Sequence, residues 1–429
     1  MVFYVKIDND EVVTMITAIM IGAGNRGIGA YGAFAEKNPE DIKFVGIADP
    51  DPMRRGYFAM KHGIPADRQY DGFEAILQTD KFADACFICT QDHMHFVPAR
   101  LAMEKKYHIF LEKPMAITPL ECIRLGELAD MHGIRLMIGH VLRYTQFFSA
   151  IKTIIDSGRI GELMSIQHNE NVSYWHQAHS YVRGNWGNTE KSCPMLLAKS
   201  CHDLDILTWF AGSDPLQVSS FGSLAYFNHD HAPKGAPKYC LDGCPHQDTC
   251  VYYAPKVYLN AEDWMKLPVS NDMSDQGLLK ALKSGPYGRC VYQADNDAVD
   301  HQVVIIEFEN RLTASFTMTA FTHENTRTIK IMGTKGEIRG HMEKNVLEIY
   351  EFGNDKPETM HLRIMEYGHS GGDYGIMKAF KALIEKGDLA DIASDKASIQ
   401  SHLLAFAAEK SRLTRQTINF KAYLRDLRG

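Results

Sequence analysis

Short apolar runs alternate with helical patterns through the first third of the chain. Buried strands are predicted to end at Ile21, Ala48, Thr90, Leu111 and Ile138. Helical patterns follow at residues 25–37, 52–63 and 72–78, from after His95 up to residue 106, and at 118–133. Such alternation is typical of right-handed βαβ units and a parallel sheet. The pattern therefore predicts an α/β domain, a doubly wound parallel sheet over residues 15–144, behind an N-terminal extension of residues 1–14.

The second half changes to closely spaced strand patterns joined by short turns. Strands are predicted at residues 163–172, 302–308, 312–321, 327–332, 337–341 and 347–352. The last five indicate an antiparallel meander. Helices are predicted at 147–157, 374–386 and 396–413. Residues 145–429 are therefore assigned to a second α/β domain, which contains a poorly patterned insertion at about 228–297.

A glycine-rich turn follows the first strand. Its sequence fits G-x-G-x-x-G, and the residues are Gly22, Gly24, Asn25, Arg26 and Gly27. The first glycine permits a tight turn, the second lets the backbone approach a pyrophosphate, and the third packs the next helix against the strand. The alternative is a glycine turn that binds no ligand.

Asp49 ends the second predicted strand, about 20 residues after the third glycine. A carboxylate there can accept both ribose hydroxyls and repels a 2′-phosphate, which favours NAD. Arg54 and Arg55 keep NADP open. Asp49 could also simply cap the next helix.

Several polar residues follow the carboxyl ends of strands, where ligands bind in doubly wound sheets. They are candidates for cofactor binding: Thr90, His93, His95, Glu112, Lys113 and His140. Any one of them could instead be structural, and for His93 and His95, taken singly, the pattern favours ordinary loop histidines.

Charge and composition narrow the function classes. The 429 residues carry a net charge of −7, which argues against a general nucleic-acid surface. No apolar run reaches the roughly 18–20 residues of a membrane span, and the N-terminus lacks a secretory pattern. Nine scattered cysteines do not suggest a disulfide framework. The expected setting is the cytoplasm, without nucleic-acid or membrane partners.

Three motifs together resemble one enzyme family. Gly22–Gly27, then Cys89–His95, then Glu112-Lys113-Pro114 resemble, in order and spacing, the glucose–fructose oxidoreductase / inositol dehydrogenase / MocA family. The resemblance implies an N-terminal Rossmann domain and a C-terminal α/β domain with a large open, mainly antiparallel sheet. It also implies NAD(P)-dependent chemistry on sugars and cyclitols. A sheet face left uncovered by helices commonly makes a subunit interface in that family, so a homodimer or homotetramer is expected.

Lys113 is the first candidate catalytic residue. Alcohol oxidation needs a base for the hydroxyl proton and a polar group that steadies the alkoxide-like transition state. Lys113 suits both roles at a strand end, and the resemblance places the family's active-site lysine there. The alternative is a surface salt bridge between Lys113 and Glu112.

His202 is the second candidate. It lies in a helical pattern over residues 196–205, where Lys199, His202 and Asp203 share one face. The family often carries Asp-x-x-x-His here, and His202 matches the acid/base histidine while Ala198 replaces the aspartate. Lys199, Asp203 or a distant group could take over its role. A Lys199–Asp203 ion pair beside a core histidine is the alternative.

A loop rich in aromatic residues and histidine follows the strand at 163–172. Aromatic faces and hydrogen-bonding groups suit a sugar ring, so its candidate substrate residues are Tyr174, His176, His179, Arg183 and Trp186. His301, before a later strand, is a further candidate. The loop residues could equally be packed side chains.

Three cysteines, Cys240, Cys244 and Cys250, lie within eleven residues of the insertion. With a nearby histidine they could hold a structural zinc ion, although their spacing is not that of a standard finger. Unligated thiols are the alternative.

Three functions fit these observations. The first is an NAD(P)-dependent dehydrogenase of a sugar, cyclitol or glycoside, with Lys113 and His202 as catalytic residues. The second is a glycosidase that oxidises C3 transiently, eliminates the aglycone and returns the hydride, so that NAD is not consumed. The third, suggested by Ala198, is a non-catalytic dinucleotide-binding sensor.

Overall fold

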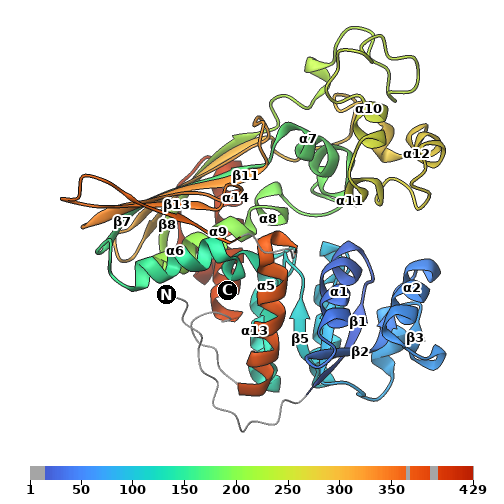
Figure 1. Cartoon of the computed structure of the whole chain (residues 1–429), viewed down its shortest axis with the longest axis horizontal. Coiled ribbons are helices and arrows are strands. Elements are labelled where there is room, and N and C mark those ends of the chain that lie inside the picture. The colour runs from blue at the N-terminus through green and yellow to red at the C-terminus, as the bar shows by residue number, and fades with distance from the viewer. Residues whose placement is uncertain (1–14, 364–367, 387–394, 429) are drawn as a thin grey trace.

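The computed structural model describes residues 15–363, 368–386 and 395–428 (Figure 1). The expected extension, residues 1–14, lies outside this part. Two sheets organise the described chain, one of six strands and one of nine. The α/β class and the change from a parallel to a mainly antiparallel sheet are confirmed.

The first sheet is parallel throughout and has the strand order of a doubly wound Rossmann domain. In spatial order its strands are β3 (Gln69–Tyr70), β2 (Ile42–Ala48), β1 (Ile16–Ile21), β4 (Ala85–Ile88), β5 (His108–Leu111) and β6 (Leu136–Ile138). The helices that connect them are α1 (Ala33–Lys37), α2 (Pro52–His62), α3 (Phe73–Gln78), α4 (Phe96–Glu104) and α5 (Pro119–His132). Separate apolar clusters bury the two faces of this sheet.

The second sheet departs from the predicted meander. Its order is β14 (Glu358–His361), β13 (Val346–Glu351), β12 (Gly336–His341), β11 (Thr326–Gly333), β7 (Leu163–Asn171), β10 (Thr313–Thr319), β9 (His301–Phe308), β8 (Pro215–Ser223) and β15 (Ile418–Asn419). β7 lies between β10 and β11 and runs parallel to β10. The meander was wrong at this point because β7 is far from both partners in sequence, and local pattern does not report such pairing.

Helices cover one face of the second sheet. α6 (Gln146–Asp156), α9 (Cys201–Ala211) and α14 (Asp395–Thr414) lie on the side toward the Rossmann domain (Figure 1). α15 (Phe420–Arg428) follows them, so the described chain closes with one helix more than the two predicted. On the opposite face, Phe221, Ile305 and Phe352 are 61%, 50% and 66% exposed. That face therefore presents large apolar side chains to solvent.

One late helix returns to the first domain. α13 (Gly372–Lys386) buries Ile376, Met377 and Phe380 in an apolar cluster of the Rossmann sheet. Lys381 Nζ donates to Asp41 Oδ1 at 2.9 Å. This late helix thus belongs to the core of the first sheet, while the division of the chain at residue 144 stays a prediction.

The insertion lies between β8 and β9 and projects beyond the end of the second sheet (Figure 1). It contains α10 (Ala254–Leu259), α11 (Asp263–Lys266) and α12 (Asp275–Leu282). Its apolar side chains form two small clusters, one of which also includes Ala178, Val182 and Ala320 from outside the insertion.

Candidate active site

The glycine turn after β1 requires glycine at two positions. Gly22 has a φ of +94°, and a Cβ there would lie 2.6 Å from the Cys89 carbonyl oxygen. A Cβ at Gly27 would lie 2.4 Å from the Gly22 carbonyl oxygen, whereas one at Gly24 would meet no atom within 4 Å. The turn is therefore tight at both ends and open in its middle. This geometry fits a pyrophosphate that approaches the backbone at the N-terminus of a helix.

Asp49 connects the end of β2 to the glycine turn. Its Oδ2 accepts the Ala23 N–H at 2.7 Å, and its Oδ1 accepts the Asp51 N–H at 2.8 Å. Arg54 Nη2 donates to the same Oδ1 at 3.2 Å, and Arg55 Nη1 donates to the Asp49 carbonyl. The carboxylate stands where an adenosine ribose is expected, but it already orders the turn.

Arg26 and Glu112 form a buried network. Arg26 Nε donates to Glu112 Oε1 at 2.6 Å, and its terminal nitrogens donate to both oxygens of Asp373 and to Tyr31 Oη. Burial opposes ionisation of Glu112, but Arg26 and Lys113 hold the pKa of Glu112 below its ordinary value. The ion-pair partner of Glu112 is therefore Arg26. The alternative of a surface salt bridge between Lys113 and Glu112 is wrong.

Lys113 lies against the helices of the second domain. Its Nζ donates to the Ala198 carbonyl oxygen at 2.8 Å, and its backbone N–H donates to Glu112 Oε2 at 2.9 Å. The predicted single helix over 196–205 is wrong here, because α8 (Met195–Ala198) ends before α9 begins at Cys201. This break presents the Ala198 carbonyl to the lysine.

His202 follows in the first turn of α9 and is 7% exposed. Its Nδ1 is buried without a hydrogen-bond partner. Burial and the neighbouring charges of Lys113 and His140 hold the pKa of His202 well below its ordinary value. The imidazole is therefore neutral at neutral pH and retains a lone pair that can accept a proton.

A buried charge cluster adjoins His202. Arg327 Nε and His168 Nε2 each lie 2.7 Å from Asp203 Oδ1. Arg327 also pairs with Glu170, and Glu170 Oε1 lies 3.4 Å from Lys199 Nζ. The Lys199–Asp203 ion pair is therefore wrong, since each residue has another partner. Burial lowers the pKa of Lys199, although Glu170 opposes the shift.

The predicted substrate loop divides between two places. Trp186 lies beside Lys113, with its ring centroid 6.0 Å from Lys113 Nζ and its Nε1 donating to Asp92 Oδ2 at 2.9 Å. His179 instead stacks on Tyr287 of the insertion at 5.1 Å between ring centroids. Burial and Arg183 lower the pKa of His179 to about 4.

Arg183 is 1% exposed and turned toward the insertion, where it donates to the carbonyls of Arg289 and Tyr252. Tyr174 packs near Tyr252, with ring centroids 6.0 Å apart. His176 stacks on Trp175 and lies 3.2 Å from Asn325 Oδ1 through its Nδ1.

The remaining strand-end candidates differ in setting. His95 Nδ1 lies 2.7 Å from the Pro114 carbonyl and its Nε2 lies 3.2 Å from the Thr90 carbonyl, so its ring joins two loops. Thr90 Oγ1 donates to the Met94 carbonyl, and His93 is exposed. His301, half-exposed at the start of β9, lies 2.9 Å from Asp300 Oδ1 through its Nδ1.

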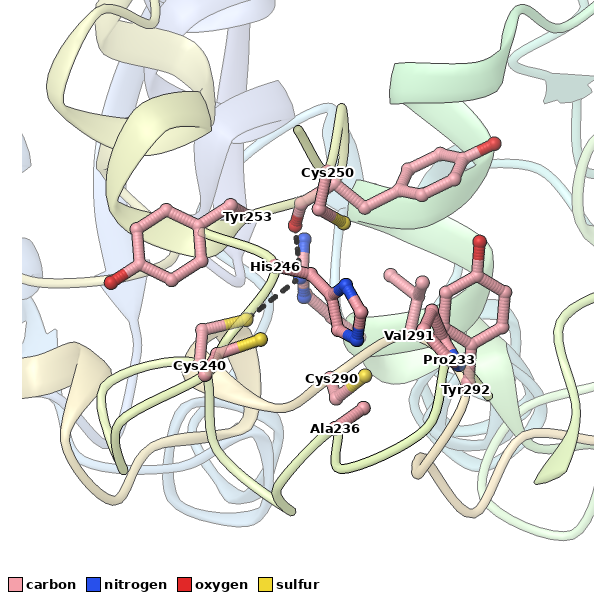
Figure 2. Close-up of a pocket in the computed structure, with 12 residues that line it drawn as sticks. Pro233, Ala236, Cys240, His246, Cys250, Tyr253, Cys290, Val291 and Tyr292 are labelled. Carbon is pink, nitrogen blue, oxygen red and sulfur yellow. Dashed lines mark hydrogen bonds between the residues drawn. The ribbon is translucent and has the colours of Figure 1, made fainter. Parts of the chain in front are cut away.

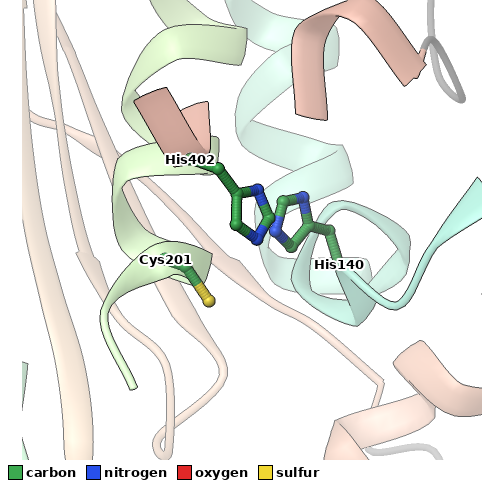
Figure 3. A group of neighbouring side chains, drawn as sticks. All are labelled: His140, Cys201 and His402. Carbon is green, nitrogen blue, oxygen red and sulfur yellow. The ribbon is translucent and has the colours of Figure 1, made fainter. Parts of the chain in front are cut away.

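His140, Cys201 and His402 lie close together, with their possible ligand atoms within 4.8 Å of one another (Figure 3). Three such ligands can bind a metal, but His402 Nδ1 donates to the Ser398 carbonyl and its Nε2 accepts the Met115 N–H at 3.0 Å. Burial raises the pKa of Cys201 to about 12. Both ring nitrogens of His402 are occupied, so the group lacks a free ligand set.

The three cysteines of the insertion line one small cavity together with a fourth, Cys290 (Figure 2). Sequence reasoning missed Cys290 because it lies 40 positions after Cys250 in no recognisable spacing. It also missed Asp92, Glu170 and Arg327, whose partners are far away in sequence.

Both halves of the chain match models of one family. Residues 16–140 match the model described as the oxidoreductase family's NAD-binding Rossmann fold, and residues 152–420 match that of the C-terminal alpha/beta domain. Among the described residues, no helix combines the length and apolar character that a membrane crossing requires.

Relatives and solved structures agree with this match. YteT of Bacillus subtilis, named as an oxidoreductase, is 22% identical over 79% of this chain and 82% of its own. Inositol 2-dehydrogenase of Burkholderia cenocepacia is 30% identical over 40% of this chain and 48% of its own. A levoglucosan dehydrogenase in complex with NADH and L-sorbose shares the fold, with a TM-score of 0.70 and 17% identity over 95% of this chain and 99% of that one.

Proposed function

The chain belongs to the glucose–fructose oxidoreductase / inositol dehydrogenase / MocA family of oxidoreductases, and from this premise we propose that it transfers a hydride between a nicotinamide cofactor and a secondary alcohol of a sugar, cyclitol or glycoside. One observation carries the proposal. The Lys113 ammonium, fixed by the Ala198 carbonyl, lies beside the neutral imidazole of His202 at the carboxyl end of β5. Binding sites of doubly wound sheets lie at these strand ends.

The two side chains divide the work on the hydroxyl group. Lys113 donates a hydrogen bond to the substrate oxygen and stabilises its negative charge as it develops. His202 accepts the hydroxyl proton, because its low pKa leaves it unprotonated. The nicotinamide, when bound, supplies the hydride acceptor. In the reverse direction His202 returns the proton, and Trp186, fixed by Asp92, offers a flat apolar face to the sugar.

The glycine turn and Asp49 support NAD as the cofactor. The open backbone at Gly24 admits the pyrophosphate, and the Asp49 carboxylate repels a 2′-phosphate. Arg54 donates a hydrogen bond to Asp49 and is therefore less available to bind a 2′-phosphate. We therefore propose that the cofactor is NAD. The alternative, NADP, is tested by comparing the two cofactors.

Polyol substrates are supported by the relatives. Inositol 2-dehydrogenase and levoglucosan dehydrogenase are named for a cyclitol and a sugar derivative. The site here adds Lys199 and His202 as polar groups near Lys113. A ligand with several hydroxyl groups fits these donors and acceptors.

A screen of sugars, cyclitols and glycosides with NAD⁺ and NADP⁺ tests the proposal. Reduced cofactor is read by absorbance and products by chromatography, independently. Net cofactor reduction with an oxidised product supports the dehydrogenase. Failure to bind either dinucleotide in calorimetry would refute the proposed function.

A second reaction is favoured by one observation. Ala198 replaces the family's aspartate and offers only its carbonyl to Lys113. Transient oxidation at C3 of a glycoside, elimination of the aglycone, addition of water at C1 and return of the hydride to C3 would give the hydrolysed sugar without net NADH. Dinucleotide binding with no turnover on any polyol would indicate the sensor instead.

We also propose a homodimer or homotetramer. The apolar, helix-free face of the second sheet, with Phe221, Ile305 and Phe352 exposed, has the character of a subunit interface.

A further inference from the structure

The insertion brings four thiols together from two segments. Tyr239 and Arg289 pair as an isolated antiparallel bridge, and the Cys290 N–H donates to the Lys238 carbonyl at 2.9 Å. The reciprocal bond runs from the Cys240 N–H to the Gly288 carbonyl. Because side chains alternate across such a ribbon, Cys240 and Cys290 project from the same side.

The remaining two thiols come from a turn that closes over the same space. The Cys250 N–H donates to the His246 carbonyl at 2.9 Å, and the Gln247 N–H donates to the Cys244 carbonyl at 3.4 Å. All four cysteines and His246 line a cavity of about 20 Å³ (Figure 2). That volume suits one small occupant rather than a multi-atom cluster.

Arg183 supplies the independent observation. Its guanidinium is fully buried against this cavity, with no carboxylate of the described residues in ion-pair contact. Nη2 donates to the Tyr252 carbonyl at 2.6 Å and approaches Cys240 Sγ at 3.8 Å, while Nη1 has no partner. A buried cation without a counter-ion costs free energy. A negative charge next to Arg183 would therefore stabilise the site.

We propose that Cys240, Cys244, Cys250 and Cys290 bind one structural Zn²⁺ ion, with Arg183 neutralising part of the site's charge. Four thiolates around Zn²⁺ carry a net charge of −2, which supplies the counter-charge that Arg183 lacks. The hydrogen bond from Arg183 to the Cys240 sulfur matches the outer groups that orient metal ligands. Because thiolates are the ligands, binding of the ion releases the thiol protons to solvent.

The ion would clamp a segment that has little core of its own. Five buried residues form the cluster that includes Cys240, and the helices around it are short. All four cysteines are free thiols and so available as ligands, and thiolate sulfurs lie about 2.3 Å from a bound Zn²⁺ ion.

Metal analysis of the purified full-length protein tests the proposal directly. The expected result is one zinc per chain after dialysis, and the same content after gel filtration. In Cys290→Ser and Cys250→Ser the zinc content falls at least tenfold, and it is unchanged in Cys122→Ala, a buried cysteine of α5 remote from the cavity. Zinc retained at full stoichiometry in Cys290→Ser would overturn the four-cysteine site.

Cobalt substitution keeps the test independent of whether the variants fold. Wild-type protein reconstituted with Co²⁺ is expected to show the intense visible bands of tetrahedral thiolate coordination. Arg183→Met should release cobalt to a chelator faster than wild type. Absence of zinc and of these bands, or iron with inorganic sulfide instead, would overturn the proposal. None of these readouts depends on turnover, so they are separate from the test of the dehydrogenase.

Discussion

At the scale of single residues, the setting of Lys113 decides what its ammonium can do. The group donates to a neutral carbonyl, that of Ala198, while the neighbouring carboxylate of Glu112 binds Arg26. An ammonium has three donors, so Lys113 keeps donors for a substrate oxygen. Glu112 and Arg26 fix the backbone that carries it.

Replacing Lys113 with Met removes the charge and keeps the length of the side chain. Turnover is expected to fall by about 10²–10⁴-fold, with NAD affinity within a few-fold of wild type. Steady-state kinetics and calorimetry measure the two effects. Lys61→Met, a surface lysine paired with Glu36, is the matched control. Undiminished turnover in Lys113→Met would contradict its catalytic role.

The low pKa of His202 has a consequence for the pH profile. A base whose pKa is lowered stays deprotonated to more acid pH, so the rate of alcohol oxidation should not decline until the pH is below about 6.5, the ordinary histidine value. The measurement is kcat/KM for oxidation between pH 5 and 8, with His202→Asn for comparison. An acid limb above the ordinary histidine pKa that disappears in His202→Asn would show that burial does not dominate at this residue.

The candidate catalytic residues can be identified from the sequence more easily than the residues that bind them. Lys113 and His202 were identified from motifs, whereas Arg26 as the partner of Glu112 and Arg327 as the partner of Asp203 are contacts between distant segments. Local periodicity contains no information on such contacts. The prediction that Arg183 binds substrate rested on the chemistry of its guanidinium group. The sequence does not tell in which direction that side chain points.

At the scale of elements, the glycine turn was predictable and the broken helix was not. Glycines 22 and 27 are required by steric contacts within one turn, which is local information. The apolar period of residues 196–205 runs on without a helix breaker, yet α8 ends at Ala198. The break is associated with tertiary bonds, from Lys113 to Ala198 and from Lys199 to Glu170. β8 and β15 were likewise missed because their pairing is non-local.

Gly27→Ala and Gly24→Ala separate the two functions of the turn. The added methyl at residue 27 would collide with the Gly22 carbonyl, and we expect a loss of about 1–3 kcal/mol of stability. The methyl at residue 24 meets no protein atom, so Tm is retained while NAD binds more weakly. Thermal unfolding and calorimetry distinguish the two variants. Equal Tm values in both would contradict the steric argument.

At the scale of the whole molecule, the second sheet has unequal faces. Helices α6, α9 and α14 bury one face (Figure 1). On the other face, Phe221 and Ile305 remain exposed on the neighbouring strands β8 and β9. The α/β architecture followed from the two strand patterns, but the area of this apolar face became apparent only with the strand order.

Charge placed on this face should dissociate the proposed oligomer. For Phe221→Asp with Ile305→Asp we expect a smaller particle in light scattering at equal concentration. Met60→Asp, at an exposed methionine of α2, is the control and should leave the mass unchanged. An unchanged mass in the double variant would place the interface elsewhere or leave the chain monomeric.

The packing of α13 on the Rossmann sheet affects when this domain can complete its core during synthesis. Phe380 completes an aromatic group with Phe87 and Phe110, at 5.3 Å from each between ring centroids. Domains generally fold as units as they leave the ribosome, the N-terminal one first. Here part of the apolar surface of the Rossmann sheet stays uncovered until the chain has been translated as far as α13. A chaperone that shields this surface in the meantime would meet the protein only while it is being made.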